Sequence, residues 1–116
     1  MRLTCVESNL SRNQKTTKDF NELLNKHFQE HKDVVFYAQK LNLTPKNLSE
    51  ILKNETGLSA KQVIEEFLMF EAKSLLKQTQ MSIKEIVYWL GYEDASYFTK
   101  YFKTKEGITP LSYRNQ

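Results

Sequence analysis

The chain has 116 residues, 40% of them hydrophobic and 27% charged, which suits one domain with a packed core. Its one cysteine, Cys5, excludes an internal disulfide and a cysteine-rich zinc site. No stretch approaches the ~18 apolar residues of a membrane helix, and the polar start does not resemble a signal peptide. We therefore expect a cytoplasmic protein without a membrane segment. Three glycines and two prolines favour a helical chain.

The distribution of charge is more informative than the formal net charge of +3, which is compatible with nucleic-acid binding but does not establish it. Residues 95–116 carry four basic side chains against Glu106 alone, a net +3. Residues 44–57 carry two side chains of each sign and are neutral. The basic surplus therefore lies at the C-terminal end.

Residues 1–16 are polar and aperiodic, and we expect them to form a linker or a disordered N-terminal end before a domain over 17–116. A first helix is predicted over Thr17–His31, with one face made of Phe20, Leu23, Leu24, His27 and Phe28. We expect His27 at the edge of the core and not as a metal ligand, and His31 to be isolated. Asp33 is the predicted cap of a second helix over Val34–Leu41.

Thr44 followed by Pro45 predicts the start of a third helix, because a hydroxyl cap and a proline at the first position suit a helix N-terminus. This helix is expected over Pro45–Glu55, with Gly57 ending it and with Leu48, Ile51 and Leu52 inward. Ser59 and Gln62 have the spacing of a capping box before a long fourth helix, Ala60–Gln78. Its buried stripe is predicted as Val63, Ile64, Phe67, Leu68, Leu75 and Leu76.

A second capping box, Ser82 with Glu85, predicts a fifth helix over Ile83–Leu90, which Gly91 ends. Asp94 is the expected cap of a sixth helix, Ala95–Glu106. Its apolar side is predicted as Tyr97, Phe98, Tyr101 and Phe102. After Gly107, Thr109-Pro110 opens a short helix to about Tyr113. Since no segment alternates with period two for long, we expect an all-α fold of about seven helices.

An internal repeat links the two halves of the chain. Val34, Tyr37, Ala38, Leu41 and Leu43 return 49 residues later as Ile83, Ile86, Val87, Leu90 and Tyr92. With an offset of 50, Leu48, Ser49, Leu52, Lys53 and Gly57 return as Phe98, Thr99, Phe102, Lys103 and Gly107. Each copy predicts a short helix, a tight turn and a longer helix.

That order is typical of a helix-turn-helix unit, whose second helix enters the major groove of DNA. A single such pair could equally belong to a plain helical bundle, but two matching copies favour the DNA-binding interpretation. The connecting helix of roughly 19 residues spans about 28 Å. Successive major-groove faces lie about 34 Å apart, so one chain could reach two of them.

The second copy resembles the signature of AraC-type transcription regulators. The matching residues are Ile86, Leu90-Gly91-Tyr92, Asp94, Ser96-Tyr97-Phe98, Phe102-Lys103, Gly107, Thr109-Pro110 and Tyr113-Arg114. The first copy and the connecting helix also resemble the family, in Ala38, Leu41, Thr44-Pro45, Leu48, Lys53, Thr56-Gly57, Glu71-Ala72-Lys73 and Leu75-Leu76. The resemblance covers about Phe20 to Arg114.

The resemblance implies a seven-helix fold of two helix-turn-helix units joined by a helix. It implies binding to double-stranded promoter DNA and, as a partner, RNA polymerase. An effector or dimerisation domain, if present, would lie outside this chain. The sequence departs from many relatives at Leu68, where they have Arg, at Tyr92, where they have Phe, and at Glu50, where a basic residue is frequent.

The outward faces of the third and sixth helices hold the predicted DNA contacts. On the first unit these are Lys46, Asn47, Ser49, Glu50 and Lys53, of which Asn47 can read adenine, Lys46 guanine or phosphate, and Glu50 cytosine. On the second unit they are Ala95, Ser96, Thr99, Lys100, Lys103 and Arg114. Lys100 is the best base reader, and Lys103 and Arg114 are expected on phosphate. For Tyr97 we favour packing over stacking on a base.

No catalytic residue, metal site or cofactor is expected, because the sequence has no glycine-rich phosphate loop, HExxH motif or paired cysteines. The serious alternative is a helical protein-interaction module that uses the same exposed faces, for example to contact RNA polymerase. Salt separates the two: DNA binding through several phosphates weakens steeply with salt, and an apolar protein groove does not.

Overall fold

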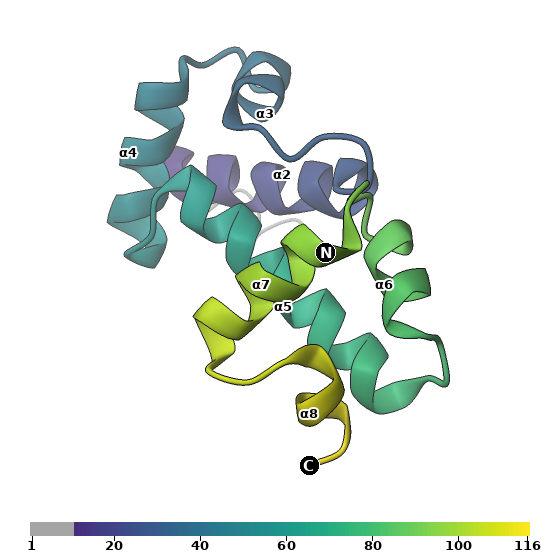
Figure 1. Ribbon diagram of the computed structural model, residues 1–116. Coiled ribbons are helices and arrows are strands. Elements are labelled where there is room, and N and C mark those ends of the chain that lie inside the picture. Colours follow the sequence, from purple (N-terminus) through teal and green to yellow (C-terminus); the bar gives the residue numbers. More distant parts are fainter. Residues whose placement is uncertain (1–10) are drawn as a thin grey trace, which may run out of the picture. The chain divides into compact units, whose positions relative to one another are not determined.

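The computed structural model describes residues 11–116, which form seven helices and no strand (Figure 1). The expected all-α fold is confirmed for this part of the chain. The described residues pack as two units, residues 11–27 with 31–64 and residues 28–30 with 65–116. None of the described helices is both long and apolar enough to cross a membrane. The expectations for Cys5 and for residues 1–10 lie outside the described residues.

The first unit begins with α2 (Arg12–His27), which starts five residues before the predicted Thr17. The missed signal is a cap: the amide of Ser11 donates to Gln14 Oε1 at 2.9 Å, and the amide of Gln14 donates to Ser11 Oγ at 3.1 Å. Such reciprocal bonds satisfy amides that the first turn leaves without partners. The predicted linker over 1–16 is therefore wrong for residues 12–16, which are helical.

The predicted end of this helix was also wrong, because α2 stops at His27 and residues 28–30 form a turn. His31 is not isolated, since its ring stacks on Phe36 with centroids 3.7 Å apart and planes 2° apart. The half-buried His27 lies edge-on to Phe36 at 5.1 Å. This confirms His27 as a residue at the edge of the core.

Two further helices, α3 (Val34–Lys40) and α4 (Pro45–Thr56), complete the first unit with the start of α5 (Ala60–Gln78). The predicted caps are confirmed: Asp33 accepts from the amide of Phe36, and Thr44 accepts from the amide of Asn47 at 3.1 Å. The core of this unit contains Phe20, Leu24, Tyr37, Ala38, Leu48, Leu52 and Ile64. Each fully buried large apolar side chain contributes about 1.5–3 kcal/mol of transfer free energy.

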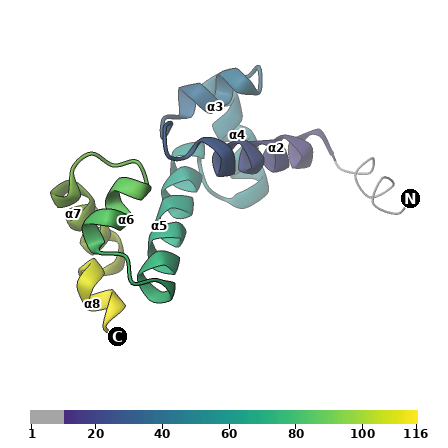
Figure 2. The same cartoon turned by 90° about the vertical axis from the view of Figure 1, so that its right-hand side faces the viewer.

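The second unit contains most of α5 with α6 (Ile83–Trp89), α7 (Ala95–Glu106) and α8 (Pro110–Arg114), which Figure 2 shows from the side. The limits of α5 and α7 are those predicted. The capping box of Ser82 with Glu85 is confirmed, with reciprocal bonds of 2.8 and 3.0 Å. Ser59 and Gln62 also bond reciprocally at the start of α5, at 2.9 and 3.3 Å.

The core of the second unit contains Phe28, Leu68, Met69, Ala72, Leu76, Ile86, Val87, Leu90, Phe98, Phe102 and Pro110. Met69 and Ala72 were missing from the predicted stripe of α5. Phe67, Leu75 and Tyr101 are half-buried. Tyr97 departs most from expectation, since 58% of it is exposed on α7 although it was assigned to the packed side.

Candidate nucleic-acid interface

The internal repeat of the sequence is also a repeat of backbone geometry. In the first unit, the turn after α3 is closed by a bond from the amide of Leu43 to the carbonyl of Ala38, at 2.8 Å. In the second, the amide of Tyr92 donates to the carbonyl of Val87 at 3.1 Å, 49 residues further along. Both turns need a left-handed residue at the same position, and Asn42 (φ +59°) and Gly91 (φ +91°) supply it. The two turns are equivalent.

The helix after each turn is also equivalent in length and in its ends. Both α4 and α7 have 12 residues. Each ends at a left-handed glycine, Gly57 (φ +83°) or Gly107 (φ +85°), whose amide donates to a lysine carbonyl four residues back. Each unit therefore contains a complete helix-turn-helix, with α4 and α7 as the second helices.

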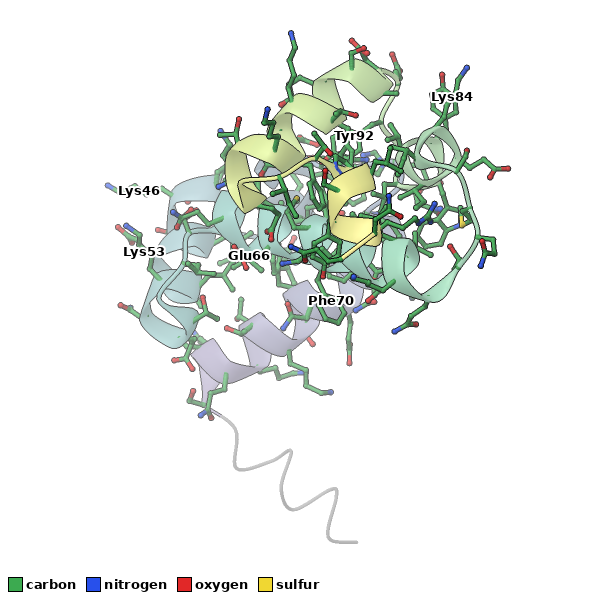
Figure 3. All side chains as sticks on the ribbon, turned by 60° about the horizontal axis from the view of Figure 1, so that its bottom comes forward. Lys46, Lys53, Glu66, Phe70, Lys84 and Tyr92 are labelled. Carbon is green, nitrogen blue, oxygen red and sulfur yellow. The ribbon has the colours of Figure 1, made fainter. Side chains whose placement is uncertain are left out.

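On α4, the structure exposes four of the five predicted contact residues, Lys46, Asn47, Glu50 and Lys53. Figure 3 shows Lys46 and Lys53 projecting away from the helix. Ser49 differs, because it is half-buried and its Oγ accepts a hydrogen bond of 3.3 Å from the amide of Ala60. The hydroxyl of Ser49 thus helps to begin α5, and its contact with DNA stays a prediction.

On α7, three of the predicted contact residues, Ser96, Lys100 and Lys103, are exposed, while Ala95 and Thr99 are half-buried. The cap of this helix is Asp94, whose carboxylate accepts from the amides of Ser96 at 2.9 Å and of Tyr97 at 3.4 Å. A carboxylate at this position also suits the positive end of the helix dipole. Since Asp94 serves as the cap, the exposed hydroxyl of Ser96 is not needed for that role.

Arg114, the last predicted phosphate contact, has a structural role that the sequence analysis did not foresee. Its Nε donates to the carbonyl of Leu76 at 2.9 Å, and its Nη2 donates to the carbonyl of Thr79 at 3.3 Å. These carbonyls lie at the C-terminal end of α5, where the helix leaves its last acceptors without partners. Arg114 therefore joins α8 to the end of α5, and its phosphate contact stays a prediction.

Two ion pairs with α5 determine which charges of α7 remain unpaired, and they leave its basic surplus unchanged. Lys105 forms an ion pair with Glu65 at 3.7 Å, and the carboxylate of Glu106 pairs with Lys73 at 3.1 Å. Lys100 and Lys103 take part in none of the ion pairs described within residues 11–116. These two side chains are the cations of α7 best placed to meet an external anion.

A cluster of tyrosines beside the exposed face of α7 was missed by the sequence analysis. The ring of Tyr97 lies 6.3 Å from that of Tyr101, nearly parallel to it, and 6.3 Å from that of Tyr92. Burial raises the pKa of Tyr92 to about 12, with smaller contributions from Tyr97 and Glu65. Burial and the charge of Glu65 also raise the pKa of Tyr101. The phenols of Tyr92 and Tyr101 are therefore neutral at physiological pH, and Tyr97 is the exposed member of the cluster.

Comparison with known proteins also identifies a helix-turn-helix protein. A family model described as a helix-turn-helix domain matches residues 37–116. The uncharacterised HTH-type transcriptional regulator YtdP of Bacillus subtilis is 39% identical over 79 residues, which are 68% of this chain and 10% of YtdP. The HTH-type transcriptional activator RhaR of Yersinia pseudotuberculosis is 29% identical over 84 residues, which are 72% of this chain and 29% of RhaR. The chain thus spans less than a third of either relative.

Among solved structures, the C-terminal domain of AraT, a response regulator from Geobacillus stearothermophilus, is similar with a TM-score of 0.79 and 32% identity. The match covers 90% of this chain and 88% of that domain. The C-terminal domain of the response regulator YesN from Fusobacterium nucleatum has a TM-score of 0.78 and 26% identity, over 86% of this chain and 98% of that domain. With the family model matching well over half of its residues, this chain belongs to the AraC-type family of helix-turn-helix transcription regulators.

Proposed function

We propose that this chain binds double-stranded promoter DNA with sequence preference and regulates transcription, with α4 and α7 each entering a major groove. The observation that carries the proposal is the duplicated helix-turn-helix backbone, in which both second helices keep an open polar face. A helix fits the major groove, and polar side chains on its outer face can reach base edges there.

Within this proposal, Lys100 reads bases and Lys103 contacts phosphate on the second unit. Lys46 and Asn47 lie in the first turn of α4, and recognition helices use such N-terminal residues to contact bases. Lys53 lies in the last turn of α4 and is proposed to contact the DNA backbone. Glu50 is exposed between them, and we favour repulsion from phosphate over contact with cytosine.

We add Tyr97 to the residues proposed to contact DNA, because more than half of it is exposed on α7. It lies one turn before Tyr101, and the two rings stack. A phenol can donate a hydrogen bond to phosphate, and its ring can contact a thymine methyl. Replacing Tyr97 with Ala should weaken DNA binding by about 1.5–3 kcal/mol, the range for a hydrogen bond to a charged group. Tyr88→Ala removes a tyrosine of α6 that is 52% exposed and is the matched control.

The same proposal gives the chain no catalytic role and places it in the bacterial cytoplasm, where promoter DNA is found. The alternative function is a helical module that binds a protein such as RNA polymerase. Exposed apolar residues away from α4 favour such a contact, above all Phe70, which is 66% exposed on α5. The labelled side chain of Phe70 is visible in Figure 3.

Selection of bound sequences from a random duplex pool tests the main proposal directly. We expect a recovered consensus and an affinity that falls steeply as the salt concentration rises. The reason is that the release of cations from several phosphates favours binding, and this gain shrinks as the salt concentration rises. Recovery of no consensus, with weak binding to every duplex, would favour the protein-interaction alternative. A random pool of single-stranded DNA is the control, since it lacks the major groove.

A further inference from the structure

The turn after α2, residues Phe28–Glu30, belongs to the second unit, whereas the helix that precedes it belongs to the first. We call these three residues the strap. They lie outside residues 37–116, which the helix-turn-helix family model matches. A segment beyond the matched residues therefore forms part of the unit that contains α7.

The strap is attached to the C-terminal end of α6 by a hydrogen bond and by ring contacts. Gln29 Nε2 donates to the carbonyl oxygen of Trp89 at 2.8 Å, across 60 residues of sequence. Trp89 is the last residue of α6, so its carbonyl is one of those that a helix cannot pair internally. The ring of Phe28 is 7% exposed and lies 5.4 Å from Trp89 and 5.2 Å from Phe67 of α5.

The attachment point lies directly before the turn that leads into α7. The turn begins at Leu90, and it is closed by bonds from the amide of Gly91 to the carbonyl of Tyr88 and from the amide of Tyr92 to the carbonyl of Val87. Both acceptor carbonyls belong to the last turn of α6. A shift or fraying of this last turn would alter the geometry from which α7 starts.

We propose that Gln29, Phe28 and Trp89 are positioning residues for α7, which hold the end of α6 and so fix the helix that reads DNA in the second unit. The proposal rests on the DNA-binding function proposed above, and it makes recognition by α7 depend on residues that precede the first helix-turn-helix. Gln29 contributes a donor to this arrangement, and the two aromatic rings contribute packing.

Amide hydrogen exchange of the full chain tests the structural part of the proposal, that the strap holds the turn between α6 and α7. Gln29→Met keeps the length of the side chain, changes no charge and removes the donor. We expect exchange at Gly91 and Tyr92 to accelerate about fivefold, the factor that corresponds to one ordinary hydrogen bond. Exchange at Phe98 and Phe102 should stay unchanged. Gln80→Met, at an exposed glutamine of the same unit, should leave all four amides unchanged. Unchanged exchange at the turn, or uniform acceleration throughout the second unit, overturns the proposal.

DNA affinity, measured with the same two variants, tests the functional part of the proposal, that the strap positions α7 for DNA binding. On the duplex that the wild-type chain selects, Gln29→Met should bind about fivefold more weakly and Gln80→Met as tightly as the wild type. A Gln29→Met protein that loosens the turn but binds with wild-type affinity overturns the positioning role. If the wild-type chain selects no duplex, the DNA-binding function fails, while the exchange experiment still decides whether the strap holds the turn.

Discussion

At the scale of single residues, the polar side chains on and near α4 and α7 fall into two groups. One group forms hydrogen bonds or ion pairs within the fold, and the other is exposed to solvent. Ser49 and Arg114 bond to the backbone at the two ends of α5, and Lys105 pairs with Glu65. Lys100 and Lys103, by contrast, extend into solvent from α7. Because a side chain already committed to the fold must break a contact before it binds DNA, the second group should carry most of the affinity.

Lys100 and Lys103 should therefore contribute more to DNA binding than Lys105, which pairs with Glu65. Replacing Lys100 with Ala should cost about 1–3 kcal/mol on the selected site and relax specificity at one position. Replacing Lys103 with Ala should weaken binding to all duplexes alike and reduce the salt slope by about one. Lys105→Ala, an equal change of charge on the same helix, should have a smaller effect. Binding isotherms at several salt concentrations measure all three, and unchanged binding of the first two variants would contradict the placement of α7 on DNA.

Glu50 on α4 should oppose DNA binding. Its carboxylate is exposed on the face of α4 that holds Lys46 and Lys53, and it would meet the negative field of the phosphates. Glu50→Gln should then raise affinity for the selected duplex and for a random duplex by the same factor. Glu55→Gln, on an exposed residue near the end of α4, serves as the control. A loss confined to the selected duplex, of about 1–3 kcal/mol, would instead make Glu50 a reader of cytosine.

At the scale of helices and turns, local signals explain what the sequence could predict. The limits of α5 and α7 were predicted because capping residues and glycines mark them, such as Ser59 before α5 and Gly107 after α7. The start of α2 was missed although Ser11 and Gln14 form the same kind of cap, because the residues between that cap and Thr17 are all polar. Its end was missed for another reason: Phe28 fits the apolar face of a helix, but it packs on Trp89 from a distant part of the chain.

The candidate site shows the same division between local and distant causes. The exposed residues of α4 could be predicted, because the inward positions of Leu48 and Leu52 define the opposite face. The exposure of Tyr97 could not, since an aromatic residue beside Phe98 looks apolar in any periodic pattern. The role of Arg114 also depends on contact with α5, which lies more than thirty residues away in sequence.

The turn between α6 and α7 should lose stability in alkaline solution through Tyr92. Its pKa is about 12 in the folded chain and 10.0 without burial, so the unfolded chain loses this proton first as the pH rises. The contribution of the protonated Tyr92 to the stability of the folded chain is complete below pH 10 and is lost between about pH 10 and 12. It should amount to about 1–2 kcal/mol, less than the full shift implies, because the ring is partly open to solvent.

Urea unfolding at pH 8 and at about pH 11.5 measures this contribution. The wild-type chain should lose more stability between the two pH values than Tyr92→Phe, which has no proton to release. Lysines titrate in both proteins and cancel in the comparison. Tyr88→Phe, at an exposed tyrosine of α6, should follow the wild type. Equal losses in all three proteins would show that Tyr92 does not couple to folding.

At the scale of the whole molecule, the duplication of one backbone motif is the feature with most consequence for binding. A single helix-turn-helix reads a few base pairs, and a dimer is the usual way to lengthen the site. Here the two copies occupy one chain, and the 19 residues of α5 extend from the first unit into the second. Linkage of two reading units raises the effective concentration of the second once the first has bound, so a monomer can reach useful affinity.

One monomer should therefore protect roughly 15–20 base pairs of the selected duplex, the span of two reading helices about one turn apart. Hydroxyl-radical footprinting at a protein concentration where sedimentation shows a monomer measures the span. Insertion of about five base pairs between the two protected segments turns one of them to the opposite face of the duplex. Affinity should then fall towards that of a duplex that carries one segment alone, because the second unit can no longer engage. Protection limited to under about 10 base pairs, or affinity indifferent to the insertion, would mean that only one of α4 and α7 reads DNA.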